Sequence, residues 1–122
     1  MELFYMSLME LAERIRSRAL SPVEVTAAML DRIGRVDAAV SSYAHVSAEP
    51  AMAAARRAEV EIMSGSYRGP LHGVPMAVKD LAWTTDAPTT AGTAVHDGFM
   101  AAEDATCVAR LREAGAVILG KL

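Results

Sequence analysis

The stretch GPLHGVPMAVKD, residues 69–80, places a lysine directly after a short apolar run. Residues 76–78 are too apolar and too few for anything but a buried strand, and Lys79 follows at its carboxyl end. Sites in α/β proteins form at the carboxyl ends of strands. An apolar environment disfavours the charged form of a lysine, so the neutral amine can act as a base. The residues alone leave a second interpretation open, in which Lys79 extends to solvent or pairs with Asp80.

The segment GAVILGKL, residues 115–122, approaches the phosphate-binding pattern G-x-x-x-x-G-K-[ST] with Gly115, Gly120 and Lys121. The residues between the two glycines read as an apolar strand, whereas a phosphate loop presents free backbone amides. Leu122 also replaces the hydroxyl residue of the pattern, and no helix follows. We therefore do not predict nucleotide binding.

Three histidines and one cysteine are the other candidate ligands: His45, His72, His96 and Cys107. Their spacings match none of the paired patterns of zinc sites, so we expect no metal site. We expect the histidines to lie on the surface or to be hydrogen-bonded, and Cys107 to be a small core residue. None of the serines sits in the glycine-flanked turn that exposes an activated hydroxyl.

The composition of the chain argues against nucleic-acid binding and against a membrane-spanning protein. The chain has 122 residues, is 52% hydrophobic and carries a net charge of −3, which indicates one small domain and no nucleic-acid binding. It contains no apolar run of the roughly 20 residues that span a bilayer. The single cysteine and the absence of a signal-like N-terminus predict a cytoplasmic protein.

The first 65 residues are predicted to be helical. Ser7 with Glu10 and Ser21 with Glu24 form capping-box patterns, and the second helix is expected to run to about Arg35. A short β-prone piece spans residues 42–46. The third helix is expected between Ser47, as its cap, and Gly65. The inner face of this helix carries mostly alanine side chains, which implies close packing against a neighbouring element. It consists of Ala51, Ala54, Ala55, Ala58 and Ile62.

Residues 66–122 are predicted to run strand, loop, helix, strand, which is the pattern of a parallel βαβ unit in an α/β fold. Asp104 is expected to cap the helix, and Gly115 to end it before a strand at residues 116–119. Leu111, Val117 and Ile118 should then share a hydrophobic layer between this helix and the sheet. Two strands leave open edges, so we expect residues 1–122 to be the N-terminal portion of a larger single domain.

The order and spacing of three motifs resemble the amidase signature family: GPLHGVPMAVKD, then PTTAGT, then DATCVARLREAGAVILGK. The upstream segment SPVEVTAAMLDRI is similar to that family's second helix. The resemblance covers nearly all of the chain. It implies a mixed sheet wrapped in helices, on a chain of several hundred residues, and the cleavage of carboxamide C–N bonds by hydrolases or amidotransferases.

The family uses a Ser–cis-Ser–Lys triad, and the resemblance implies that Lys79 is its lysine. Lys79 would take a proton through the bridging serine, so that the nucleophilic serine attacks the amide carbonyl. In the family pattern both serines lie beyond Leu122, which implies that the chain carries only the lysine and is inactive alone. Leu122 stands where the family has threonine, and Asp86 where glycine is common.

Two hypotheses from different classes remain at this point. In the first, the chain is part of an amide hydrolase whose partner is a small-molecule amide and which needs no cofactor. In the second, it is a non-catalytic helical module that binds a partner, or a second copy of itself, through exposed strand edges. Neither hypothesis involves nucleic acid or a membrane.

Overall fold

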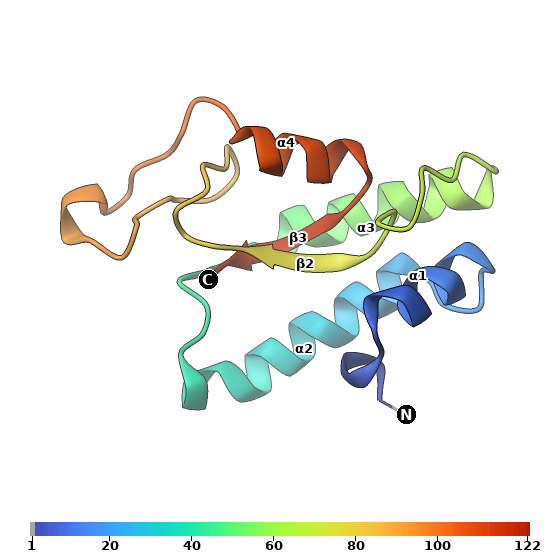
Figure 1. Cartoon of the computed structure of the whole chain (residues 1–122). Coiled ribbons are helices and arrows are strands. Elements are labelled where there is room, and N and C mark those ends of the chain that lie inside the picture. The colour runs from blue at the N-terminus through green and yellow to red at the C-terminus, as the bar shows by residue number, and fades with distance from the viewer. Residues whose placement is uncertain (1) are drawn as a thin grey trace.

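The computed structural model describes residues 2–122, which fold into helices around a small mixed sheet (Figure 1). Four α-helices, two 3-10 helices and three strands are formed by these residues. In chain order they are η1 (Leu3–Tyr5), α1 (Leu8–Arg16), α2 (Pro22–Val40), β1 (His45–Val46), α3 (Ala48–Met63), β2 (Pro75–Val78), η2 (Ala94–His96), α4 (Thr106–Glu113) and β3 (Val117–Lys121). The predicted α/β class is confirmed.

The starts predicted for the first three helices are confirmed, whereas the fourth helix begins one residue later than predicted, and two of the four predicted caps are not formed. Ser7 and Ser21 each form a complete capping box with the glutamate three residues later. Ser47 precedes α3 as predicted, but its side chain makes no capping bond. The prediction for Asp104 is wrong, because Ala105 occupies the N-cap position of α4 and the Asp104 carboxylate accepts the Thr85 N–H instead, at 2.9 Å.

The sheet has the order β1-β3-β2. Strands β2 and β3 are parallel, with Pro75 opposite Val117, and the register shifts between Met76 and Val78. The connection through α4 therefore forms the predicted βαβ unit. The β-prone piece before α3 becomes β1, which pairs antiparallel with β3, so the sheet is mixed and β3 lies at its centre.

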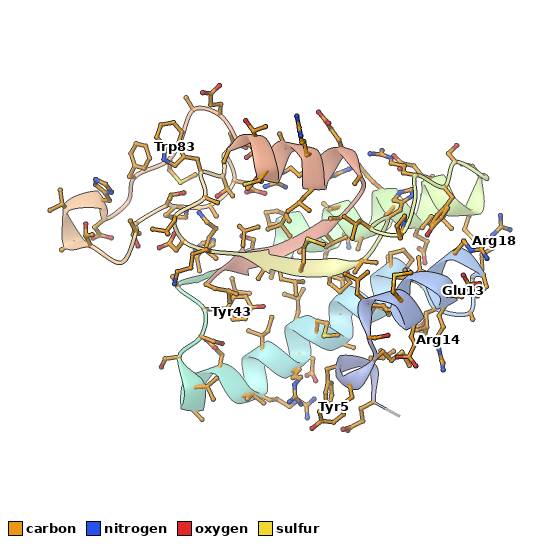
Figure 2. The ribbon with its side chains drawn as sticks, in the orientation of Figure 1. Tyr5, Glu13, Arg14, Arg18, Tyr43 and Trp83 are labelled. Carbon is orange, nitrogen blue, oxygen red and sulfur yellow. The ribbon has the colours of Figure 1, made fainter. Side chains whose placement is uncertain are left out.

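Helices cover both faces of this sheet (Figure 1). Helix α4 lies on one side of β2 and β3, whereas α1 and α2 lie on the other, and α3 packs against both α2 and β3. One core cluster joins the first three helices to the segment before β2 and comprises Leu11, Ala12, Ile15, Val25, Ile62 and Val74. A second joins α3 to β3 through Ala51, Ala55, Val117 and Leu119, and Tyr43 packs against it from the connection between α2 and β1 (Figure 2).

Burial differs between the two long strands. Every residue of β3 is buried, as a central strand with both faces covered requires, whereas β2 is only half-buried at its outer position. Val117 and Ile118 are buried as predicted, but they do not share one layer. Val117 packs with the alanines of α3, and strand alternation turns Ile118 to the opposite face.

The alanine-rich face of α3 is confirmed. Ala51, Ala55 and Ala58 are buried and Ala54 is half-buried, which lets the helix backbone approach β3 closely. Among residues 2–122, no helix combines the length and the apolar character needed to cross a membrane.

Candidate active site

The chain contains two lysines, and they lie at the same end of two neighbouring strands. Lys79 directly follows β2, and Lys121 ends β3, where it pairs with Val78. Their surroundings are opposite. Lys79 is exposed to solvent, whereas Lys121 is completely buried.

Lys79 projects from a backbone that is held on both sides. The N–H of Leu122 donates to the Val78 carbonyl at 2.8 Å, and the N–H of Asp80 donates back to the Leu122 carbonyl at 2.7 Å. The Lys79 carbonyl then accepts from the Ala82 N–H at 2.9 Å, which turns the chain away from the sheet. Lys79 borders a pocket of about 190 Å³ whose other lining residues are Ala44, Asp80, Leu81, Ala91, Gly92 and Leu122.

The position of Lys79 at the carboxyl end of a strand agrees with the prediction, but its predicted enclosure in apolar surface is not found. Within residues 2–122 no element covers this side chain, and β2 beside it is only half-buried. The alternative surface pair with Asp80 is also not formed. Asp80 is buried and points to the other side, toward Lys121.

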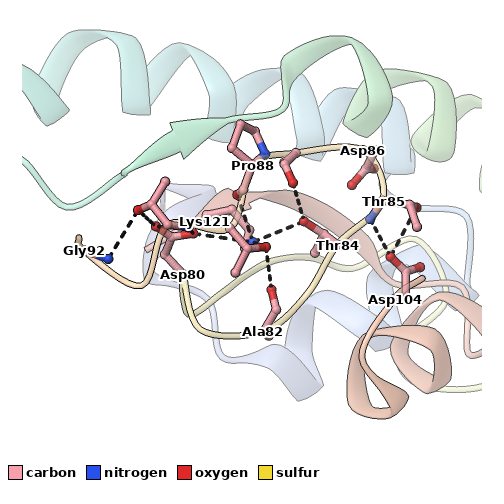
Figure 3. Close-up of polar contacts among 12 residues, drawn as sticks. Asp80, Ala82, Thr84, Thr85, Asp86, Pro88, Gly92, Asp104 and Lys121 are labelled. Carbon is pink, nitrogen blue, oxygen red and sulfur yellow. Dashed lines mark hydrogen bonds and ion pairs between the residues drawn. The ribbon is translucent and has the colours of Figure 1, made fainter. Parts of the chain in front are cut away.

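The sequence marks Lys121 only as part of an incomplete phosphate-binding pattern, yet it has the more elaborate polar surroundings of the two lysines. Its Nζ donates to Thr84 Oγ1 at 3.1 Å, to the Pro88 carbonyl at 3.1 Å and to Thr89 Oγ1 at 2.7 Å (Figure 3). These bonds use all three protons of an ammonium group. Asp80 Oδ1 lies 3.5 Å from the same nitrogen. Burial lowers the pKa of Lys121, and the Asp80 carboxylate opposes that effect.

Asp80 is the acceptor at the centre of the cluster. Its carboxylate accepts the backbone N–H of Thr90 at 3.1 Å and the Thr90 hydroxyl, and it faces the Lys121 ammonium. Burial alone would raise the pKa of Asp80, but the Thr90 hydrogen bonds and the Lys121 charge hold it below its ordinary value. Asp80 is therefore an ionised anchor.

The loop over Lys121 is tied to the rest of the fold by its own polar contacts. The Thr84 hydroxyl donates to the Ala87 carbonyl at 3.0 Å. Arg112 of α4 pairs with Asp86 at 2.7 Å and with Asp104 at 3.0 Å. Asp86 stands where glycine is common in the motif pattern described above, and its bond to Arg112 fastens this loop to α4.

The other candidate ligands do not form a site. His45 and His96 are exposed, and His72 is buried, accepting the Arg68 N–H at Nδ1 at 3.1 Å. The prediction that Cys107 is a core residue is wrong, because the buried position on α4 is taken by the next residue along, and Cys107 is exposed. No three His, Cys, Asp or Glu side chains gather as a metal-binding group within the part of the chain that the structure describes.

Comparison with known proteins places this arrangement in a family. Residues 24–122 match the family model named Amidase. The Mycobacterium tuberculosis protein AmiD, which is named as a putative amidase, is 56% identical over 117 residues, covering 96% of this chain and 25% of that protein. A glutamyl-tRNA(Gln) amidotransferase subunit of Geobacter metallireducens is 46% identical over 122 residues, covering 100% of this chain and 25% of that polypeptide.

The fold agrees with these matches. The crystal structure of an amidase family protein from Bacillus anthracis superposes with a TM-score of 0.88 at 35% identity, covering 98% of this chain and 24% of that one. The chain spans about a quarter of the length of the curated relatives that it matches. The motifs, the mixed sheet and these likenesses agree, and the chain belongs to the Amidase family.

Proposed function

We propose that this chain is the lysine-bearing portion of an enzyme that hydrolyses carboxamide C–N bonds through a Ser–cis-Ser–Lys triad, with Lys79 as the base. One observation carries the proposal. Lys79 is exposed and lines a pocket at the carboxyl end of the parallel strands, whereas Lys121 is completely buried.

The contacts of Lys121 support the choice between the two lysines. Its ammonium donates three hydrogen bonds in a fully buried position, so it can neither reach a substrate nor accept a proton. Lys79 is exposed, and its side chain is free to meet a hydroxyl brought by another part of the protein. If the triad lysine comes from this chain, it is Lys79.

The proposed reaction moves one proton along the triad. The neutral amine of Lys79 accepts the proton of the bridging serine, which takes the proton of the nucleophilic serine. The nucleophilic oxygen attacks the amide carbonyl, the tetrahedral intermediate expels the amine with a proton returned through the triad, and an acyl-enzyme remains for water to hydrolyse. The segment that carries both serines would also cover Lys79 and exclude bulk water from the reaction.

The test compares acylation by the polypeptide at the full length that its gene encodes with acylation by Lys79→Ala and Lys79→Arg variants. Both variants should acylate at least about 100-fold more slowly, because alanine has no base and a guanidinium stays protonated. Arg35→Met, which removes an exposed charge on α2, should acylate at the wild-type rate. Near-wild-type acylation by Lys79→Arg would overturn the assignment of the base.

A second measurement concerns the 122-residue chain itself. We expect it to turn over no simple aryl or alkyl amide, because a base without a nucleophile and an oxyanion hole cannot form the tetrahedral intermediate. Turnover by the purified chain that persists in Lys79→Ala would contradict both this expectation and the role of Lys79.

A further inference from the structure

The buried cluster around Lys121 lies directly behind the residue that the proposed function makes the base. We propose that Lys121 is a positioning residue for Lys79, acting through Asp80 to fix the end of β2 from which Lys79 projects. This inference rests on the proposed function for its catalytic meaning. Its structural part, that Lys121 holds this end of the strand, can be tested separately.

The first step is the contact between Lys121 and Asp80. The two side chains meet at 3.5 Å between Nζ and Oδ1, and both are almost completely buried. Lys121 also binds Thr84, Pro88 and Thr89, so one ammonium joins the residue after Lys79 to the loop at residues 84–89 (Figure 3). Removing this charge would leave the Asp80 carboxylate buried without its counter-ion.

The second step is the path from Asp80 to Lys79. The Asp80 N–H donates to the Leu122 carbonyl at 2.7 Å, and the Asp80 carbonyl accepts the Ala91 N–H at 2.9 Å. The side chain and the backbone of Asp80 are therefore both fixed. Residues 78 and 80, on either side of Lys79, are both held by backbone hydrogen bonds, so these contacts also set the Cα–Cβ direction of Lys79.

The third step is the far wall of the pocket. Thr90 donates its N–H and its hydroxyl to the Asp80 carboxylate. Ala91 and Gly92 follow in the left-handed backbone region, with φ of 51° and 69°, and both line the pocket beside Lys79. One carboxylate thus sets the strand end that carries Lys79 and also the opposite wall of its pocket.

The free-energy cost of removing Lys121 and Asp80 from water supports a geometric role for this ion pair. A buried ion pair is often no more stabilising than an apolar pair of the same volume, so stability alone does not account for it. A charged pair with fixed hydrogen bonds specifies one arrangement where an apolar pair tolerates several. A base must be held within a fraction of an ångström of the hydroxyl that it deprotonates, which is the property such an arrangement supplies.

The first experiment measures backbone amide hydrogen exchange by NMR in the 122-residue chain. We expect Lys121→Met to accelerate exchange at Asp80, Thr90 and Leu122 at least about tenfold more than at amides of α1 and α3. Thr89→Val is a milder variant that removes one acceptor of Lys121 and nearly keeps the side-chain volume. It should act in the same direction, and it decides the question if Lys121→Met does not fold.

Two outcomes of the exchange experiment would overturn the proposal. Equal acceleration at all amides would show that Lys121 contributes only to global stability. Unchanged exchange at the three amides in a folded variant would show that Lys121 does not hold the end of β2. Arg35→Met, which breaks the exposed Asp31–Arg35 pair on α2, is the matched control and should change neither set.

The second experiment measures kcat and KM for an amide substrate in the full-length polypeptide. Lys121→Met should lower kcat at least about tenfold while KM changes less than about twofold, at a temperature where the variant is folded. Lys79→Ala is measured in parallel. If Lys79→Ala stays active, the proposed function fails whatever Lys121 does. If Lys79→Ala is inactive and folded Lys121→Met keeps its kcat, the positioning role alone fails.

Discussion

Replacing Gly120 with alanine is expected to separate β1 from β3. A Cβ built on Gly120 would overlap the carbonyl oxygen of His45, far inside the 3.0 Å within which real Cβ contacts are essentially never seen. The obstacle is a backbone atom, so no side chain can rotate out of the way. Strand β1 must therefore move by about 1 Å or unpair from β3.

The size of the effect follows from the bonds that β1 would lose. The N–H of Ala44 donates to the Lys121 carbonyl and the N–H of Ser47 to the Leu119 carbonyl, each at 2.8 Å. Each bond contributes about 1 kcal/mol to the free energy of unfolding. With these two bonds and part of the antiparallel pairing between β1 and β3 lost, we expect Gly120→Ala to lower that free energy by about 2–3 kcal/mol, and the Tm by about 8–12 °C.

Gly34→Ala is the matched control, with an effect of opposite sign. Gly34 lies inside α2, and a Cβ there would meet nothing within 4 Å. Alanine in a helix interior is about 1 kcal/mol more favourable than glycine, so the Tm should rise by about 4 °C. Both variants are measured by thermal unfolding followed with far-UV circular dichroism. A Tm for Gly120→Ala within about 2 °C of wild type would refute the reasoning.

Three further outcomes are expected. Exposed Cys107 should react with a thiol reagent in the native chain nearly as fast as in denaturant; strong protection would contradict its placement. Burial holds the pKa of His72 below its ordinary value, and the Glu61 carboxylate opposes that effect. The contribution of neutral His72 to the free energy of unfolding is therefore complete above about pH 6.5, and it is lost as the pH falls through the pKa of the folded state. Tm measured from pH 7.5 to 5 should therefore fall less in His72→Gln than in wild type, and equal slopes would argue against this. Arg112→Ala should lower the free energy of unfolding in urea by about 1–2 kcal/mol, since Asp86 and Asp104 lose their shared partner, and an unchanged midpoint would exclude that role.

The helices could be predicted because their signals are local. Ser7 and Ser21 each meet a glutamate three residues on, and the capping bonds close within a single turn. Asp104 stands in an equally good position, yet its carboxylate is taken by the N–H of Thr85, 19 residues earlier. A cap predicted from sequence therefore fails where a distant donor competes for the same oxygen.

Side-chain burial was predicted less well, because it depends on which element lies opposite. Cys107 and Val108 are adjacent apolar residues of a short helix, and only the position of α4 on the sheet decides that Val108 is buried. Val117 and Ile118 were both expected to face α4. Alternation along β3 separates them, and the packing of α3 against the second face gives Val117 a different partner.

The two lysines show where local sequence reasoning ends. Each lysine stands at the end of a short apolar run, yet an apolar enclosure was predicted for Lys79 alone, and the structure buries Lys121 instead. The difference arises from strand order and from the loop at residues 84–89. Strand β3 is central and the loop closes over its end, whereas β2 is an outer strand whose end stays open. Neither the strand order nor the closure of this loop over the end of β3 can be inferred from the apolar run that precedes each lysine.

The different surroundings of the two lysines suit the different roles proposed for them, with buried Lys121 as the anchor and exposed Lys79 as the candidate base. A lysine that fixes one segment of the chain against another does so by hydrogen-bonding with all three of its ammonium protons, and buried Lys121 forms these three bonds. A lysine that must exchange a proton needs an unbonded amine and a free approach, which the interior would deny it. Lys79 meets that requirement because Asp80, its neighbour, points inward to Lys121 and leaves the outward direction to Lys79. The adjacent Lys-Asp pair can therefore serve both needs, because directly after β2 the Lys79 side chain is exposed while the Asp80 side chain is buried against Lys121.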